Sequence, residues 1–321
     1  MAADLQQTPA WFLWPAGLGA LYVAALSSRL LAHLAHCLRR PRDLCRCYGA
    51  WAVVTGPTSG IGRSVTLELA GRGLNLVAVD LREVSDTITS RHAVETRTVV
   101  FDLSLVSTPQ GHEALRRLRD AVEGLDVGVL VNNAGVMRPG AAFLHEGDAE
   151  VYVRMIRVNL WAPTAMAAAV IPGMAARGRG AVVNVGSGSS EAVSSFPLHA
   201  VYSGTKRYLA RLSGGLAAEY AGRGVDVQCQ APLFVATEMM AGFSGVWRNK
   251  ALAPTADAYA RAAVRWVGRG GPLCVPSLRH RLLWCLLAAV PGCVQDWVCL
   301  REGMRQRRSS PASACTPRAS N

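Results

Sequence analysis

The chain has 321 residues, half of them apolar and 17% charged, with a formal net charge of +12. This composition excludes a disordered chain, and the length accommodates one large domain or two of ordinary size. The sequence contains neither an internal repeat nor a Gly-X-Y period, which excludes solenoid and collagen-like architectures.

The first predicted element is a long apolar helix over residues 11–38. Residues 11–26 carry no charge, but a span needs about 20 residues, so the segment is long enough only if it continues past Arg29 to Leu38. We expect a membrane anchor that spans the bilayer; a helix lying on the membrane surface and a buried core helix are the alternatives. Because the positive charge follows the apolar run, the downstream domain should face the cytosol.

Basic side chains are concentrated on either side of the central part of the chain. Residues 29–46 and residues 301–321 each carry a net charge of +4, which accounts for 8 of the 12 positive charges. A general preference for arginine explains the total equally well, because the chain has only two lysines. The placement beside apolar segments favours an anionic membrane surface, and we expect no nucleic-acid partner.

Between residues 48 and 275, short apolar runs alternate with helical patterns. Strands that alternate with helices indicate a parallel sheet covered on both faces, and therefore a doubly wound α/β domain of Rossmann type. The predicted strands are residues 52–55, 75–79, 98–101, 127–131, 181–185 and 225–230. The predicted helices are residues 60–70, 113–123, 150–169, 202–220 and 257–267.

A second apolar run, residues 282–290, follows this domain. Nine residues are too few to cross a bilayer, so the run either docks on the membrane surface or completes the core. After residue 300 we expect a basic, Ser/Pro-rich and disordered tail. The predicted organisation is a membrane anchor with its basic flank (1–47), a Rossmann-type domain (48–275), an apolar membrane-associated segment (276–300) and the tail (301–321).

A glycine-rich turn joins the first predicted strand to the first predicted helix. Gly56 allows a tight turn, Gly60 lets the backbone approach a pyrophosphate, and Gly62 permits close packing of the helix on the strand. The helix N-terminus then faces the negative phosphates of a dinucleotide. In this strand–turn–helix context the candidate cofactor-binding residues are Thr55, Gly56, Thr58, Ser59, Gly60, Ile61 and Gly62.

Polar residues after the next strands extend the predicted cofactor site. Asp80 ends the second strand, where a carboxylate binds both ribose hydroxyls of NAD and repels the extra phosphate of NADP. Arg82 is a competing ligand for that phosphate, and Asp102, after the third strand, suits the adenine edge. Asn-Asn-Ala-Gly follows the fourth strand, and three of its residues are assigned to the cofactor site: Asn132, Ala134 and Gly135.

Tyr202 and Lys206 are the strongest catalytic candidates. They are one helical turn apart and therefore lie on one face of a helix. A lysine ammonium beside a phenol is expected to lower the phenol pKa from about 10 toward neutrality. Such a tyrosine can give a proton to a developing alkoxide or take one from an alcohol. Arginine would supply the charge but cannot relay a proton.

Three further residues are assigned to the catalytic or substrate site. Ser187 follows the fifth predicted strand, and we expect its hydroxyl to orient the reacting carbonyl. Ser189 competes for this role in a pliable loop that contains glycines. Asn159 lies inside the long predicted helix, where asparagine is a poor helix former, and we expect it to hold a water that links Lys206 to solvent.

The segment after the sixth strand completes the predicted site. Leu233 is a candidate for contact with the substrate, and Thr237 for contact with the cofactor. Residues 233–247 are rich in Phe, Met and Val, so we expect them to form a lid over an acyl chain.

Cysteine and histidine give no metal-binding pattern. The nine cysteines are irregularly spaced, and we expect reduced, mostly buried thiols in a protein that faces the cytosol. His33 and His36 lie three residues apart on a helical pattern, but a pair alone does not make a metal site. We therefore expect no metal.

Together these motifs resemble the short-chain dehydrogenase/reductase family. The resemblance covers residues 48–300 and is carried by Thr-Gly-x-x-x-Gly-Ile-Gly, Asn-Asn-Ala-Gly, Asn159, Ser187 and Tyr-x-x-x-Lys. Within the family, the chain is most similar to the membrane-bound very-long-chain 3-oxoacyl-CoA reductases of plant type. The segments that carry this closer similarity are residues 54–62, 73–77, 124–133, 226–230 and 259–266.

The resemblance implies an NAD(P)-dependent oxidoreductase of fatty-acid elongation in the endoplasmic reticulum membrane. It would reduce 3-oxoacyl-CoA to 3-hydroxyacyl-CoA with NADPH, although Asp80 favours NADH on electrostatic grounds. An acyl-CoA or another lipid would be its substrate, and other elongation enzymes its partners. The alternatives are a dehydrogenase of hydroxysteroids or other lipid alcohols, and a catalytically silent, nucleotide-binding membrane scaffold.

Overall fold

The structure is a computed structural model that describes residues 10–80, 92–240 and 253–309. The chain divides into two units, residues 1–40 and residues 41–321. In the first unit, helix α1 (Ala10–Leu38) is long and apolar enough to cross a membrane, as the sequence predicts. The stretch Ala149–Ala176 of the second unit is also long and apolar enough to cross a membrane, but half of it is buried inside the protein.

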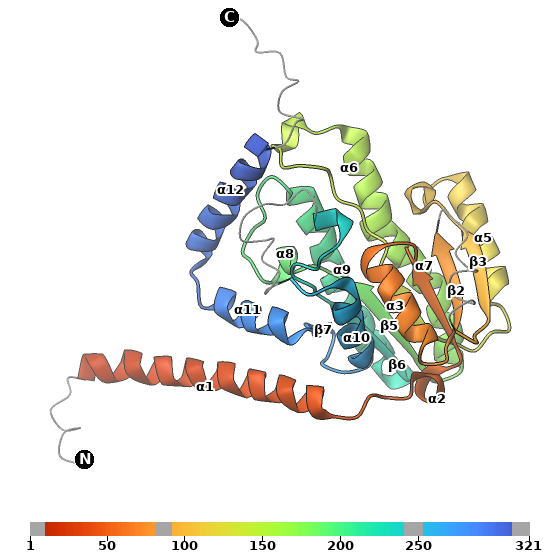
Figure 1. Ribbon diagram of the computed structural model, residues 1–321, viewed down its shortest axis with the longest axis horizontal. Helices are drawn as coiled ribbons and strands as arrows, with labels where there is room; N and C mark the ends of the chain where they lie inside the picture. The colour runs from red at the N-terminus through yellow and green to blue at the C-terminus, as the bar shows by residue number, and fades with distance from the viewer. Residues whose placement is uncertain (1–9, 81–91, 241–252, 310–321) are drawn as a thin grey trace, which may run out of the picture. The chain divides into compact units, whose positions relative to one another are not determined.

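The second unit is built on a parallel sheet with the strand order β3-β2-β1-β4-β5-β6-β7 (Figure 1). The order reverses between β1 and β4, as in a doubly wound sheet, and this confirms the predicted Rossmann-type architecture. The strands are β1 (Trp51–Thr55), β2 (Asn75–Asp80), β3 (Thr96–Val100), β4 (Val127–Asn132), β5 (Gly180–Val185), β6 (Val225–Gln230) and β7 (Leu273–Cys274).

Residues 81–91, between β2 and β3, lie outside the described residues. The other successive strands are connected by helices, which cover both faces of the sheet. The longer ones in this unit, up to β7, are α3 (Gly60–Ala70), α5 (Pro109–Val122), α6 (Ala149–Ile156), α7 (Ala162–Ala176), α9 (Ala200–Tyr220) and α10 (Ala256–Arg265). The short ones are α2 (Leu44–Tyr48), η2 (Leu103–Leu105), η3 (Leu144–Glu146), η4 (Arg157–Trp161), α8 (Gly188–Glu191), η5 (Ala221–Arg223) and η6 (Glu238–Met240).

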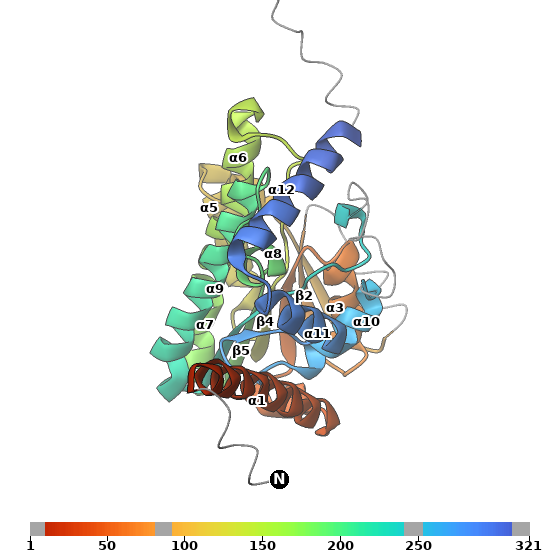
Figure 2. The ribbon, with the colours of Figure 1, turned by 90° about the vertical axis from the view of Figure 1, so that its left-hand side faces the viewer.

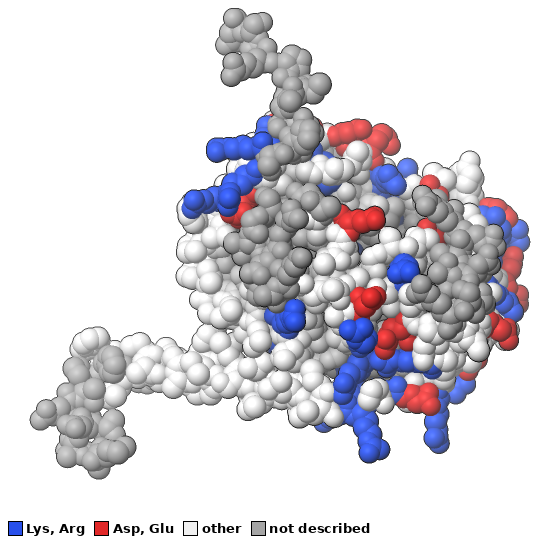
Figure 3. Space-filling model, viewed as in Figure 1, with Lys and Arg blue, Asp and Glu red and all other residues white. Residues whose placement is uncertain are grey.

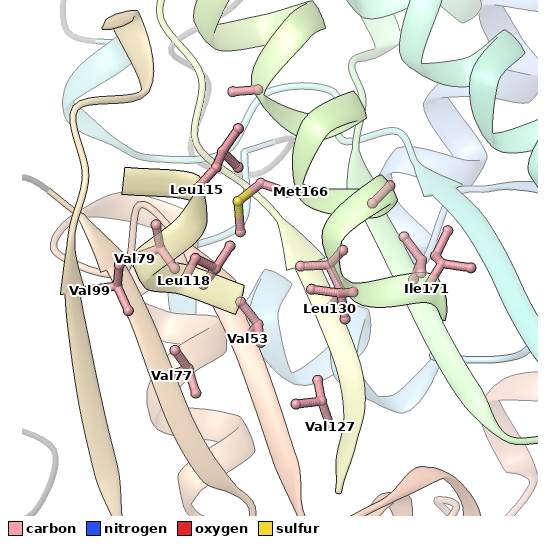
Figure 4. Close-up of a cluster of buried hydrophobic side chains, with 14 of the residues drawn as sticks. Val53, Val77, Val79, Val99, Leu115, Leu118, Val127, Leu130, Met166 and Ile171 are labelled. Atoms are coloured by element: carbon pink, nitrogen blue, oxygen red, sulfur yellow. The ribbon is translucent and has the colours of Figure 1, made fainter. Parts of the chain in front are cut away.

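The core has two layers because the central strands are apolar on both sides. On one face, Val53 and Leu130 of the sheet pack against Leu118 of α5 and Met166 of α7 (Figure 4). On the other face, α3 and α10 pack against the alternate strand positions, such as Val54. The two layers fix the carboxyl ends of the strands, where the candidate site lies.

Residues 41–47 belong to the second unit and not to the anchor, so the predicted boundary at residue 47 moves to residue 40. α2 buries Leu44 and Tyr48 in the core. The Tyr48 hydroxyl donates to Asp226, and Arg42 donates to the Tyr48 oxygen at 2.7 Å. Arg42 and α2 are therefore part of the folded second unit.

Two helices follow β7, α11 (Leu278–Ala288) and α12 (Gly292–Ser309), and their axes are bent by 118°. Because α12 continues to Ser309, the prediction of a disordered tail from residue 301 is wrong for residues 301–309. That the apolar run, residues 282–290, docks on the membrane surface or completes the core stays a prediction. His280 and Cys299 are buried in the body, whereas Leu286 and Trp297 are exposed.

Candidate functional site

The carboxyl ends of β1, β4, β5 and β6 surround a cavity of about 330 Å³. It lies beside the point where the strand order reverses, which is the usual ligand site of doubly wound sheets. Its lining is mostly apolar and comes from segments far apart in the sequence. The predicted site residues that line it are Gly56, Ser59, Gly60, Ile61, Asp80, Asp102, Ala134, Gly135, Ser187, Ser189, Tyr202, Lys206, Leu233 and Thr237.

The glycine-rich turn is held in place by Asn133. The Asn133 amide donates to the carbonyl oxygens of Thr55 and Gly56, at 3.1 and 3.2 Å. In return, the Thr55 hydroxyl accepts from the backbone N–H groups of Asn133 and Ala134. A Cβ at Gly62 would lie 2.0 Å from the Gly56 oxygen and 2.2 Å from the Asn133 amide. Gly62 thus permits close packing, as predicted, but the packing partner differs. The start of α3 packs against this turn and the Asn133 side chain, whereas the sequence predicted that it packs against the strand.

Asn132 does not line the cavity, contrary to its assignment to the cofactor site. Its side chain is buried and donates to Asn184 Oδ1 at 2.8 Å and to the Pro163 oxygen at 3.3 Å. Successive side chains of a strand point to opposite faces, and Asn132 is the last residue of β4. The members of Asn-Asn-Ala-Gly that line the cavity are Asn133, Ala134 and Gly135.

Two carboxylates lie on the cofactor side of the cavity. Asp80 accepts a 2.7 Å hydrogen bond from the Thr58 hydroxyl, so the turn and the end of β2 are joined directly. Asp102 caps η2 by accepting from the backbone and the hydroxyl of Ser104. Arg82, the predicted competitor of Asp80, lies outside the described residues.

Tyr202 and Lys206 share one face of α9 and both line the cavity, as predicted. Lys206 is buried, and its ammonium donates to the Val185 carbonyl at 2.9 Å. The ammonium nitrogen lies 6.0 Å from the centre of the Tyr202 ring. The lysine therefore approaches the tyrosine while it is anchored to the end of β5.

The predicted lowering of the Tyr202 pKa is wrong for this structure. Burial raises the pKa of Tyr202, and a hydrogen bond with Ser187 opposes this only in part. Burial lowers the pKa of Lys206 to about 8. Desolvation is the largest cause of both shifts, since each group loses hydration in the same apolar cavity.

The serine loop after β5 presents two hydroxyls to the cavity. Ser187 caps α8, and its hydroxyl accepts from the Ser189 backbone at 3.1 Å. The two side-chain oxygens lie 2.8 Å apart. Ser190 is bonded to the Ser187 carbonyl and does not line the cavity. Ser187 is therefore the hydroxyl placed between Ser189 and Tyr202.

Asn159 lies in a π-helical turn, η4, which interrupts the single helix predicted over residues 150–169. Its amide nitrogen donates to the Val136 carbonyl and to the Thr205 hydroxyl, and its oxygen accepts from the Val136 N–H. Because both amide hydrogens are taken by protein groups, the predicted water has only the oxygen to bind. Asn159 thus fixes the Gly135–Val136 segment, which faces the Lys206 ammonium.

The C-terminal helices supply part of the site that the sequence did not reveal. Leu287 of α11 and Cys299 of α12 line the cavity. The buried His280 imidazole accepts from the Leu233 N–H at 3.3 Å and donates to the Phe234 carbonyl at 3.0 Å. Burial lowers the pKa of His280 to about 4, so the ring stays neutral and keeps both roles near neutral pH. Nothing in the local sequence distinguishes this histidine from an ordinary core residue.

The described residues contain no group of three or more His, Cys, Asp or Glu side chains able to hold a metal ion. All eight cysteines within the described part of the chain are free thiols. The polar groups of the cavity are therefore hydroxyls, amides, an ammonium, a guanidinium, a thiol and three carboxylates.

A family model described as short chain dehydrogenase matches residues 50–245. The chain belongs to the short-chain dehydrogenase family. This agrees with the fold, with the turn at the end of β1 and with the Tyr202–Lys206 pair on α9.

The names of individual relatives in the short-chain dehydrogenase family differ in the substrate that they mention and in whether they call the protein inactive. A very-long-chain 3-oxoacyl-CoA reductase-like protein of Arabidopsis thaliana is 39% identical over 85% of this chain and 87% of its own length. An inactive hydroxysteroid dehydrogenase-like protein 1 of Homo sapiens is 36% identical over 70% of this chain and 68% of its own. A short-chain dehydrogenase from Sphingobium yanoikuyae, solved in complex with NADPH, is 28% identical, with a TM-score of 0.60 over 84% of this chain and 98% of its own.

Proposed function

We propose that the chain reduces 3-oxoacyl-CoA to 3-hydroxyacyl-CoA with a reduced nicotinamide cofactor, in very-long-chain fatty-acid elongation. The observation that supports this most is the convergence of Ser187, Tyr202 and Lys206 on an apolar cavity that the glycine-rich turn also enters. Similarity to a very-long-chain reductase-like protein over most of both chains supports the substrate class.

The turn between β1 and α3 fits the pyrophosphate of NAD(P)H. Gly56 and Gly60 have φ angles of +66° and +52°, which glycine adopts readily, and the N-terminus of α3 adjoins the cavity. Gly56, Ser59, Gly60 and Ile61 would hold the phosphates, and Asp80 would hold the adenosine ribose. When bound, the reduced nicotinamide supplies the hydride.

Three residues that line the cavity supply the proton, stabilise the resulting phenolate and orient the carbonyl group. With its raised pKa, Tyr202 keeps its proton at neutral pH and can donate it to the carbonyl oxygen as that oxygen becomes an alkoxide. Lys206, largely protonated at neutral pH, stabilises the phenolate that remains. The Ser187 hydroxyl orients the carbonyl oxygen toward Tyr202.

Neutralising Asp80 should improve NADPH binding. The Asp80 carboxylate repels a ribose 2′-phosphate, whereas the amide of Asp80→Asn still accepts the Thr58 hydrogen bond. We expect the Kd for NADPH to fall roughly tenfold and the Kd for NADH to rise, measured by cofactor fluorescence titration. Asp120→Asn, on the exposed side of α5, is the control. An unchanged NADPH affinity in Asp80→Asn would mean that the carboxylate does not face the ribose.

The substrate class is tested by comparing kcat/KM of the full-length protein for a long-chain 3-oxoacyl-CoA and for a ketosteroid, with each nicotinamide. A higher value for the acyl-CoA supports the proposal. A higher value for the steroid supports the second candidate, a hydroxysteroid dehydrogenase, toward which the name of the human relative points. Cofactor binding without turnover of either would leave a nucleotide-binding membrane scaffold.

We place the protein in the endoplasmic reticulum membrane, with α1 as its anchor and the catalytic unit in the cytosol. The apolar length of α1 supports the anchor, and the arginines that follow it support the orientation. An acyl-CoA thioester is the expected small-molecule partner, and other enzymes of elongation are the expected protein partners.

A further inference from the structure

Helices α11 and α12 form one surface element, which we name the C-terminal cap (residues 278–309; Figure 2). Its inner side belongs to the site, since Leu287 and Cys299 line the cavity. Its inner side also holds the catalytic helix, because Gln306 accepts a 3.1 Å hydrogen bond from His199, the residue that precedes α9. The cap is therefore a fixed wall of the substrate cavity.

The outer side of the cap is apolar and exposed to solvent. On α11, every fourth residue from Leu278 to Leu286 is an exposed leucine, and Leu286 is 66% exposed. On α12, Trp297 is 58% exposed. The exposed large apolar residues of the cap are Leu278, Leu282, Leu286, Val294, Trp297, Val298 and Leu300. Exposed apolar residues concentrated on one surface element are typical of an interaction surface.

Positive charge borders this apolar surface. The cap contains six arginines and two acidic residues, a net charge of +4. The two acidic residues are bonded within the protein, Asp296 to two serine hydroxyls and Glu302 to Arg305, and Arg307 is paired with Glu146. The Arg301 guanidinium lies 5.2 Å from the centre of the Trp297 ring. In Figure 3 the surface over α11 and the start of α12 is mostly uncharged, and basic side chains gather toward the end of α12.

These features fit a lipid surface better than a membrane crossing. An interfacial helix carries tryptophan and leucine beside arginine, and an anionic leaflet attracts the arginines. The cap cannot cross the bilayer as a bent pair, because His280, Cys299 and Gln306 on its inner side are buried in the body. The chain also contains α1, which is long and apolar enough to cross a membrane. Arg42, four residues after α1 ends, is bonded to Tyr48 in the folded second unit.

We propose that the outer side of the C-terminal cap docks on the headgroup region of an anionic lipid bilayer, so that a lipid ketone enters the cavity from the membrane. The entry route rests on the proposed function, whereas the docking does not. The bilayer contact would be additional to α1 and would involve the wall of the substrate cavity itself.

Docking is tested on the full-length protein in vesicles that contain phosphatidylserine and brominated phosphatidylcholine. Bromine quenches tryptophans at the depth where it is attached, so we expect Trp297→Phe to remove part of the quenched emission. Trp161→Phe, which removes a comparably exposed tryptophan of η4, should leave that part unchanged. Equal quenching in the wild type and in Trp297→Phe would overturn the proposal. A dimer in which the emission of Trp297 is not quenched would also overturn the proposal, because a second copy of the chain would then cover the cap.

Entry from the membrane is tested by kinetics. Leu286→Glu should raise KM on the order of tenfold for a long-chain 3-oxoacyl-CoA held in vesicles, but not for a short, water-soluble one. Leu144→Glu, a leucine 63% exposed outside the cap, is the matched control. An equal change for both substrates would overturn membrane entry. If the wild type turns over neither substrate, the proposed function fails, and the quenching experiment still decides the docking.

Discussion

Replacing Tyr202 by phenylalanine should lower kcat/KM for ketone reduction by about 10² to 10⁴-fold, the usual contribution of a positioned proton donor. The ring would still fill its place on the cavity wall, since phenylalanine lacks only the hydroxyl. The loss should appear in kcat with little change in the Kd for the cofactor, and single-turnover absorbance of the reduced nicotinamide would measure it.

Two comparisons separate a chemical loss from a structural one. Tyr208→Phe removes a hydroxyl from the same helix, where Tyr208 bonds Thr164 and lies outside the cavity lining, so its rate should stay near the wild-type value. Thermal unfolding should show both variants folded. A Tyr202→Phe protein as active as the wild type would remove the proton-donor role and, with it, the proposed mechanism.

Gly62→Ala should damage both stability and cofactor binding. Its Cβ would meet the Gly56 oxygen at 2.0 Å, and that oxygen is backbone held by Asn133, so the whole turn must move. We expect the free energy of unfolding to fall by about 1–3 kcal/mol. We also expect the cofactor Kd to rise at least roughly tenfold, because the turn would no longer fit the phosphates.

Gly214→Ala is the matched control, because Gly214 lies within α9 and a Cβ there meets nothing within 4 Å. Alanine should stabilise that helix by about 0.5–1 kcal/mol and leave cofactor affinity unchanged. Urea unfolding and fluorescence titration of both variants measure the two effects. Wild-type stability in Gly62→Ala would show that the turn has more room than its contacts indicate.

The sheet and the centre of the site were predictable because local signals agreed with the fold. Apolar runs of strand length alternate with amphipathic helices, and the glycine spacing of the turn reports a backbone requirement directly. Tyr202 and Lys206 were predictable for the same kind of reason, since positions four apart in a helix share a face. Asn132 was misassigned because a run of two asparagines does not show which one points inward.

Other features depend on contacts that no short segment encodes. The π-helical turn around Asn159 places an amide against Val136, which is 23 residues away in sequence. Leu198, just before α9, has a φ of +64°, which costs a non-glycine residue about 1–2 kcal/mol and persists only if tertiary packing holds it. Gly303 of α12 packs against Leu198, and the sequence alone placed that glycine in a disordered tail.

One imidazole connects α11 to the wall that a ketone would touch. His280 holds the backbone of Leu233 and Phe234 from α11, so a shift of this helix must be transmitted to that loop or break the two bonds. Thermodynamic linkage then works in both directions. If phospholipid changes the affinity for the ketone by some factor, the ketone changes the affinity for phospholipid by the same factor.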